Sequence, residues 1–259
     1  MFKLKSLLAL IVISIFFGSF AAYSQGSAGD AASYESRNIV DMPTAGVLPK
    51  GKFVFGTQYF AGGGMLAELQ VAPFTNFTGG LSFGGQNIIG SGDPNYQNIP
   101  GIQIKYRFYD ERLYSPALAI GFSSQGRGAY SNAGKRFEVM SPGFYFAVSK
   151  NFNWALGNVA AHGGLNYSFE SSSSQRSLNL YAGVEQSIGS RGSISFEYNA
   201  NLDDKNKVYK DNQGMLNSAI RYSIGKGFTF ELQLRDLLDN SKNASSPIRW
   251  AGAEWIASF

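Results

Sequence analysis

The ten residues Ser193-Ile-Ser-Phe-Glu-Tyr-Asn-Ala-Asn-Leu202 carry the pattern that decides the fold of this chain. Polar side chains occupy the odd positions and apolar side chains the even positions, without a break. Successive side chains of a β-strand point to opposite faces, so this strand has one polar and one apolar face. Its length fits the roughly 9–11 residues that a tilted strand needs to cross a bilayer. The stretch predicts a membrane strand with Ile194, Phe196 and Tyr198 toward lipid.

The other face of this strand carries Ser195, Glu197 and Asn199. We expect these side chains to line a water-filled lumen, so that cysteines in their place react with a water-soluble thiol reagent. For the same reason, an arginine should be tolerated much better at position 195 than at position 196.

Eleven further segments show the same alternation, several of them less cleanly. They are 52–60, 65–71, 77–84, 102–109, 116–123, 143–151, 159–170, 177–188, 214–224, 228–235 and 248–259. Every backbone N–H and C=O must be paired in hydrocarbon, so such a sheet has to close on itself. The sequence therefore predicts an all-β protein, a transmembrane antiparallel up-and-down β-barrel of about twelve strands.

The connecting segments alternate between short and long. The short ones are 72–76, 110–115, 152–157, 189–191 and 225–227, and the long, polar ones are 85–100, 124–142, 203–213 and 236–247. Membrane barrels have short periplasmic turns and longer outer loops. The connection 61–64 departs from this rule, since it is short on the outer side. A soluble sandwich or lipocalin-like barrel would also alternate but has no reason for this asymmetry.

The composition excludes several other classes of protein. Charged residues make up 15% of the 259 residues, against about 25% in ordinary soluble domains. The chain has no cysteine, so disulfides and thiolate metal sites are excluded. Only one long apolar run occurs, at the N-terminus, which excludes a helical membrane protein. The net charge of +4 comes from scattered basic residues, so nucleic acid is not an expected partner.

The N-terminus predicts export. Lys3 and Lys5 precede the apolar run 7–20, and Ala22-Tyr-Ser24 supplies small residues for cleavage, so residues 1–24 are typical of a secretory signal peptide. Two interpretations remain for the polar leader 25–50. It is a disordered periplasmic segment, or it enters the barrel as a partial plug with Ile39, Met42 and Val47 packing inside. The barrel itself is expected to occupy residues 51–259.

The C-terminus predicts assembly in an outer membrane. Trp255, Ala257 and Phe259 share one face of the last predicted strand. A terminal aromatic residue on that face resembles the signal that outer-membrane barrels present to their insertion machinery. We therefore expect a bacterial outer-membrane protein with both termini in the periplasm, and with outer-membrane lipid and the insertion machinery as partners.

The segment Asn38-Ile-Val-Asp-Met-Pro-Thr-Ala-Gly-Val-Leu-Pro-Lys-Gly51 resembles the "NMPSA…G" opening of the YjbH/GfcD-type exopolysaccharide outer-membrane proteins. Further matches are Lys105-Tyr-Arg107, Glu111, Pro116-Ala-Leu-Ala-Ile-Gly121 and Ser149-Lys150, so the resemblance spans roughly residues 38–170. The family usually has an Asp followed by Gly-Thr-Gly after the Pro-Ala-Leu-Ala strand, where this chain has Ser123-Ser-Gln-Gly-Arg-Gly128. Its chains are also typically much longer.

The resemblance implies an outer-membrane barrel with ties to surface polysaccharide. Polysaccharide and polysaccharide-export proteins are the partners that it implies, and it brings no catalytic residues.

Nine residues are candidates for lining the lumen, because they lie on the polar faces of predicted strands. They are Lys105, Arg107, His162, Asn166, Glu185, Glu197, Arg221, Glu231 and Arg235. Charges of both signs favour a salt-bridged structural lumen, and a charged ladder that sets what passes through the pore is the alternative. Because Lys105 and Arg107 project to the same face of one strand, we expect a weak preference for anions.

No catalytic, cofactor-binding or metal-binding residue is predicted. His162 is the only histidine and falls on the polar face, whereas a barrel lipase needs its Ser-His pair on the lipid-facing wall. The sequence thus favours a non-enzymatic barrel, either a small pore or an accessory to surface polysaccharide export. The alternatives are a barrel hydrolase acting on lipid or glycan, and a structural or adhesive barrel with a blocked lumen.

Overall fold

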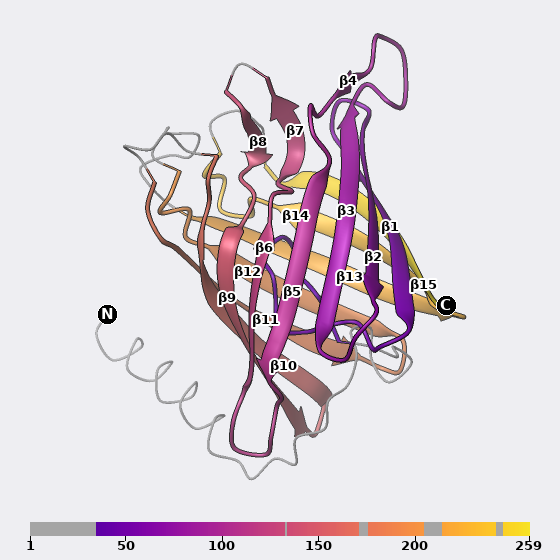
Figure 1. Ribbon diagram of the computed structural model, residues 1–259, viewed down its shortest axis with the longest axis vertical. Helices are drawn as coiled ribbons and strands as arrows, with labels where there is room; N and C mark the ends of the chain where they lie inside the picture. The colour runs from indigo at the N-terminus through magenta and orange to yellow at the C-terminus, as the bar shows by residue number, and fades with distance from the viewer. Residues whose placement is uncertain (1–34, 133, 171–175, 205–213, 242–245) are drawn as a thin grey trace.

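Twelve antiparallel strands form a closed barrel in the computed structural model, which describes residues 35–132, 134–170, 176–204, 214–241 and 246–259 (Figure 1). The predicted signal peptide, 1–24, lies outside the described residues, as do residues 25–34 of the leader. The barrel strands are β1 (Lys52–Phe60), β2 (Gly64–Ala72), β3 (Phe77–Gln86), β5 (Gly101–Tyr109), β6 (Ala117–Ser123), β9 (Gly143–Trp154), β10 (Gly157–Tyr167), β11 (Asn179–Ile188), β12 (Gly192–Asn199), β13 (Met215–Gly225), β14 (Phe228–Arg235) and β15 (Ile248–Ser258).

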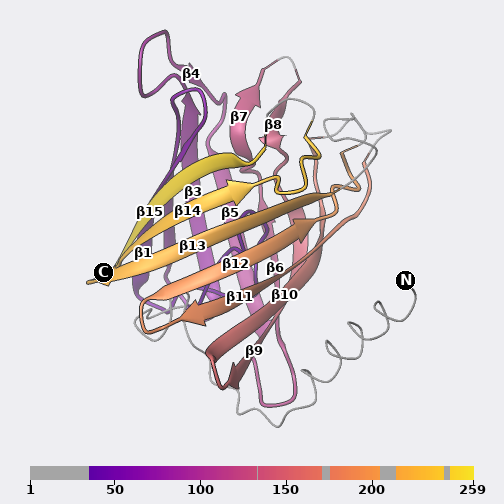
Figure 2. The same cartoon turned by 180° about the vertical axis from the view of Figure 1, so that it is seen from behind.

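The ring closes between the first and last strands. β1 pairs with β15 from Lys52 opposite Ser258 to Tyr59 opposite Ala251, and each other strand pairs with its neighbours in sequence. The strands β10 to β15 form the rear wall in Figure 1 and face the viewer in Figure 2. The predicted up-and-down barrel of about twelve strands is confirmed. No helix in the described part of the chain is long and apolar enough to span a bilayer.

Three short strands lie outside the barrel wall and were not expected from the sequence. β4 (Asn95–Tyr96) pairs with the end of β3, while β7 (Arg127–Ser131) and β8 (Arg136–Val139) form a separate hairpin. All three belong to long connections at one end of the barrel (Figure 1). Segments of two to five residues are too short to produce a readable alternation, which explains why they were missed.

Several strand ends differ from the expected ones by one to three residues. β12 ends at Asn199, so residues 200–202 lie beyond the strand that was expected to include them. β10 ends at Tyr167, where its register against β9 shifts, so Glu170 lies in a loop rather than on a strand. β9 extends to Trp154, which shortens the turn to residues 155–156.

The outer surface of the wall is apolar, as the alternation predicts. On β12, Phe196 and Tyr198 are exposed, whereas Ser195, Glu197 and Asn199 on the other face are buried. Exposed aromatic and aliphatic side chains recur on the outer faces of β5 and β14. This is the arrangement of a barrel wall that faces lipid.

Phe196→Arg should lower the free energy of unfolding by about 2–4 kcal/mol, because it places a charge in lipid at the middle of β12. The measurement is urea unfolding of the protein in phospholipid vesicles. Phe228→Arg is the matched control, since Phe228 also faces outward but begins β14 at the barrel end and should cost about 0–1 kcal/mol. Equal costs at the two positions would contradict the lipid-facing assignment.

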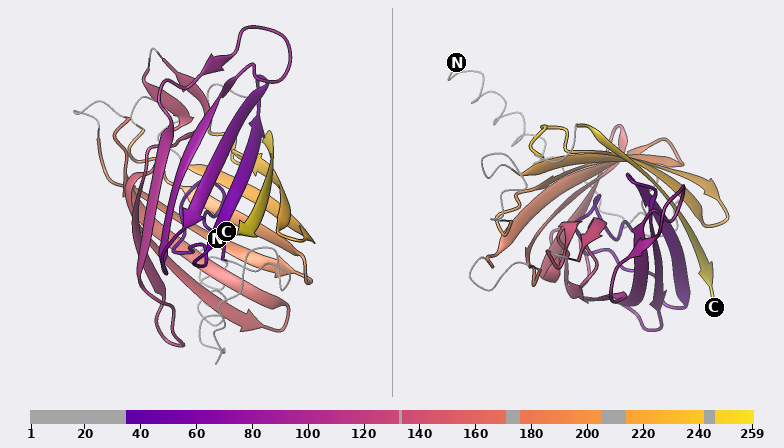
Figure 3. Two further views of the ribbon diagram at one scale, coloured as in Figure 1. Left: turned by 45° about the vertical axis from the view of Figure 1, so that its right-hand side comes forward. Right: turned by 90° about the horizontal axis from the view of Figure 1, so that it is seen from above.

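The N-terminal segment lies inside the barrel. Residues 35–48, which we call the plug, run through the lumen and appear as an indigo trace within the ring of strands (Figure 3, right). Ile39 and Met42 pack against Tyr181 and Met215 of the wall, and Leu48 packs against Val54. A β-carbon on Gly183 would lie 2.7 Å from Ile39 Cγ2, so the glycine lets the plug approach β11 closely.

The expectation that the polar face of β12 is open to water is wrong in this structure. Ser195 and Glu197 have no exposed surface, and Asn199 is 3% exposed. The plug covers Ser195 and Glu197, and Ser195 Oγ donates to the backbone oxygen of Ile39 at 3.2 Å. Asn199 instead accepts from Asn179 Nδ2 of the neighbouring strand at 2.7 Å. A thiol reagent cannot reach these positions while the plug is in place, and an arginine at 195 would collide with it.

Candidate functional site: the closed lumen

The centre of the plug is a tight turn that carries Asp41 at its tip. Ile39 N–H donates to Met42 O at 2.9 Å, and Thr44 N–H donates to Arg37 O at 3.0 Å. The Thr44 hydroxyl accepts from Gly46 N–H at 3.0 Å. These local bonds bend residues 37–46 into a compact loop. The loop directs consecutive backbone N–H groups toward β12.

Glu197 of β12 binds the backbone of that turn. One of its carboxylate oxygens accepts hydrogen bonds from the backbone N–H groups of Val40, Asp41 and Met42, at 2.9, 2.8 and 2.8 Å. The other oxygen accepts from Asn217 Nδ2 at 3.2 Å. Successive N–H groups in a turn form an anion-binding concavity, so a buried carboxylate is stabilised here without a cation of its own.

Asp41 is held by β14, which is separated from β12 by a single strand, β13. Its carboxylate forms a two-pronged ion pair with Arg235, with Nη1 and Oδ1 2.8 Å apart, and both side chains are 1% exposed. The guanidinium also lies over the ring of Trp250, 3.6 Å from its centroid, and donates to Gln233. Paired, hydrogen-bonded and stacked charges are the condition under which a buried ion pair is tolerated.

Lys105 and Arg107 also hold the N-terminal segment. Lys105 Nζ donates to the backbone oxygens of Arg37 and Gly46, at 2.7 and 3.0 Å. Arg107 pairs with Glu35 at the start of the described plug, and its Nε lies 2.9 Å from the carboxylate of Asp110. The two cations that were expected to line an open pore are therefore engaged by the plug in this structure.

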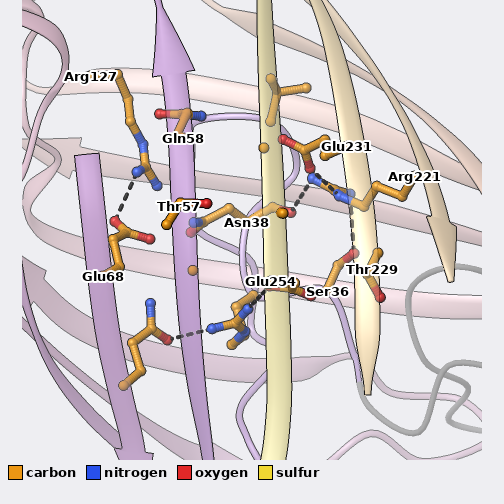
Figure 4. Close-up of a pocket in the computed structure, with 16 residues that line it drawn as sticks. Ser36, Asn38, Thr57, Gln58, Glu68, Arg127, Arg221, Thr229, Glu231 and Glu254 are labelled. Atoms are coloured by element: carbon orange, nitrogen blue, oxygen red, sulfur yellow. Dashed lines mark hydrogen bonds and ion pairs between the residues drawn. The ribbon is translucent and has the colours of Figure 1, made fainter. Parts of the chain in front are cut away.

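A polar cavity of about 100 Å³ remains between the plug and the wall strands β1, β2, β14 and β15 (Figure 4). Three ion pairs surround it: Arg37 with Glu254, Arg127 with Glu68, and Arg221 with Glu231. The space has room for several water molecules.

A Ser-His pair lies beneath the plug, and the sequence did not reveal it. Ser149 Oγ is 2.8 Å from His162 Nδ1, and Ser149 also accepts from the backbone N–H of Ala45 at 2.9 Å. Ser149 faces inward on β9 opposite His162 on β10. Both residues are buried, and a cavity of about 30 Å³ lies beside them.

The remaining predicted lumen residues also point inward. Arg221 brings Glu231 and Glu185 together, and its Nη1 lies 3.8 Å from Glu185. Asn166 donates to the backbone oxygen of Pro142 at 3.0 Å and accepts from Asn179 at 3.0 Å. All nine candidates thus lie on the inner side of the wall. Asp41 was missed because the leader has no alternation from which its orientation could be read.

The predicted assembly residues lie at the end of β15. Trp255 faces outward and contacts the rings of Phe53 and Phe228, with centroids 5.6 and 5.9 Å apart. Phe259 N–H donates to Gly51 O at 3.0 Å, and its side chain is exposed. Their role as an insertion signal stays a prediction.

The hairpin β7–β8, which we call the lid, lies at the barrel end away from the C-terminus (Figure 2). Arg136 forms a two-pronged ion pair with Asp204 in the β12–β13 connection, at 2.8 and 2.7 Å. Glu170 accepts from the N–H groups of Phe137 and Ser141, both at 2.9 Å. Burial raises the pKa of Glu170, and it raises the pKa of Asp203, next to the ion pair, to about 6.

The fold and the lumen together define a membrane β-barrel of the outer-membrane type, closed by its own N-terminal segment. The described residues contain no cluster of three or more His, Cys, Asp or Glu side chains placed to hold a metal ion.

Comparison with known proteins adds structural neighbours. No family model and no curated protein sequence matches the chain. Among solved structures, the NanC porin in a rhombohedral crystal form is similar at 12% identity and a TM-score of 0.39, covering 80% of this chain and 98% of that chain. A substituted Rh. blastica porin is similar at 10% identity and a TM-score of 0.25, with the same coverage.

Proposed function

We propose that this protein is a non-enzymatic barrel of the bacterial outer membrane that works as a small-solute pore, closed at rest by its plug. The observation that carries the proposal is the seating of residues 35–48 inside a polar wall. The wall beneath the plug carries Glu197, Arg221 and Arg235, which suit a water-filled lumen once the plug leaves.

The chemistry of the plug contacts supports a closure that can be undone. Hydrogen bonds and ion pairs dominate its anchors, as at Glu197, Asp41 and Lys105. Polar groups that leave such contacts exchange them for water, so the net cost of separation is far below the gross strength of the bonds. An interface made only of large apolar side chains would hold more permanently.

The absence of an enzymatic role is part of the proposal. Ser149 and His162 form a hydrogen-bonded pair. The serine hydroxyl also accepts a hydrogen bond from the backbone N–H of Ala45 in the plug. The pair lies on the inner face of the wall, away from membrane lipid. These observations favour a role in seating the plug.

An accessory role in surface polysaccharide export is the second candidate. Its specific support is the position of the residues that resemble the YjbH/GfcD-type opening. Met42, Thr44 and Ala45 are at most 2% exposed inside the lumen, so the resembling motif coincides with the plug. A protein of this kind would use the same movable segment to admit or contact a glycan chain.

The proposal predicts a low conductance that rises when the plug is weakened. In planar bilayers, we expect the wild type to show rare openings or none. The double variant Asp41→Asn with Glu197→Gln should open at least tenfold more often, because it removes both carboxylate charges that fix the central turn. Lys52→Ala is the control, since Lys52 contacts Ser258 at the barrel end and not the plug.

Correct folding of each variant is checked by heat-modifiable gel mobility. A folded double variant that stays as closed as the wild type would favour a structural barrel with a blocked lumen. In the open state, Lys105→Glu with Arg107→Glu should reverse the weak anion preference that reversal potentials in a salt gradient report. An unchanged selectivity would exclude these two cations as the pore's filter.

A further inference from the structure

The lid and the plug meet inside the barrel. Val139 of β8 is buried in one apolar cluster with Ile39 and Met42 of the plug, together with Tyr181 and Met215 of the wall. The two segments enter the lumen from opposite ends of the barrel, yet they share this core. Each covers apolar surface of the other, so removing either one exposes the cluster to water.

A polar contact adds to the apolar one. Arg127, at the start of β7, pairs with Glu68 on the wall at 2.8 Å. Arg127 also contacts the plug. In the side-chain amide orientation that satisfies its hydrogen-bond partners, the oxygen of Asn38 accepts from Arg127 Nη2 at 3.1 Å. Arg127 thus joins lid, wall and plug at the cavity shown in Figure 4.

The anchors of the lid at the outer face are distinct from those of the plug. The Arg136–Asp204 ion pair and the two N–H groups on Glu170 involve outer connections and no plug residue. The hydrogen bonds and the ion pair that Glu197 and Arg235 make with the plug involve no lid residue. The two closures therefore have separate principal anchors, and they meet at the shared apolar cluster and at Arg127.

We propose that lid and plug form one coupled gate, so that displacing the lid from the outer face loosens the plug, and loosening the plug frees the lid. Coupling between two sites is reciprocal, because each segment stabilises the other by the same free energy. The device lets an event on the outer surface change the state of the segment that leads to the opposite end of the barrel. It rests on the proposed gated pore for its purpose, though not for its test.

The experiment measures each segment with a single introduced cysteine, which the cysteine-free chain allows. Val40→Cys reports on the plug and Val139→Cys on the lid; both positions are buried. The probe is a water-soluble maleimide, applied to the full-length protein in phospholipid vesicles. Arg136→Ala should speed labelling at position 40 at least tenfold, although residue 136 is not a plug contact. Asp41→Asn should likewise speed labelling at position 139.

The control is Lys135→Ala, which removes a cation from an exposed position next to Arg136 and should leave labelling at position 40 unchanged. If Arg136→Ala fails to fold by gel mobility, Asp204→Asn removes the same ion pair with less loss of volume. If Arg136→Ala speeds labelling at position 139 but not at position 40, or changes neither rate, the coupling is overturned. Conductance of the same proteins tests the proposed pore separately. Coupled labelling without any conductance would support the coupling of lid and plug and would contradict the proposed pore.

Discussion

Glu197→Ala should speed the labelling of a cysteine at position 40 by at least about 100-fold. The substitution leaves three buried backbone N–H groups of the plug without their acceptor. Each unsatisfied group costs about 1–3 kcal/mol, so the seated plug loses at least about 3 kcal/mol. A tenfold change in an equilibrium corresponds to about 1.4 kcal/mol, which gives the expected factor. The measurement is maleimide labelling of Val40→Cys in vesicles.

Glu197→Gln is the informative companion, because it keeps an oxygen that can accept from the turn and removes only the charge. Charge-assisted hydrogen bonds are roughly twice as strong as neutral ones, so an intermediate rate is expected. Glu254→Gln serves as a control on the plug's periphery, where the pair with Arg37 is partly exposed and worth little. If Glu197→Ala labels no faster than Glu254→Gln, the turn is not held by this carboxylate.

Arg235→Met should destabilise the seated plug by a similar free energy for a different reason. Asp41 would keep a buried carboxylate without its cation, and breaking a buried ion pair from one side costs about 3–5 kcal/mol. We expect labelling at position 40 to rise by about 100-fold or more. Loss of the stacking of Arg235 on Trp250 should also appear as a change in tryptophan fluorescence.

The double variant Arg235→Met with Asp41→Asn separates the ion pair from mere packing. Neutralising both partners removes the uncompensated charge, and the asparagine can still accept from Asn217 as Asp41 does at 3.3 Å. We expect it to recover more than half of the loss measured in free energy. A double variant that labels as fast as Arg235→Met alone would show that the bulk of Arg235, and not its charge, holds the plug.

The wall of this barrel could be predicted because its signal is local. In Ser193-Ile-Ser-Phe-Glu-Tyr-Asn, each residue's face is decided by its neighbours one position away, through the two-residue period of a strand. The same period assigns Lys105, His162 and Arg235 to the inner side, where the structure has them. The number of alternating segments gives about twelve strands, and closure of the sheet follows from the need to pair every backbone group in lipid.

Short elements carried too little pattern to be foreseen. The lid strands β7 and β8 have five and four residues, and their place is fixed by contacts with Asp204 and Glu170 from other connections. Ser149 escaped notice for a similar reason. Its partner His162 lies opposite on the next strand, and that register is set by the strand pairing and not by either residue alone.

Only the tertiary structure decided what the inner face meets. Alternation distinguishes two faces, but a polar side chain gives the same pattern whether it faces water or the backbone of another segment. Asp41 and Arg235 are separated by 194 positions, and the leader that carries Asp41 has no period from which its route could be derived. The local pattern of residues is enough to predict a barrel with a polar interior. The filling of that interior depends on long-range complementarity: a turn with three free N–H groups fits a buried carboxylate, and a buried guanidinium fits the aspartate at its tip.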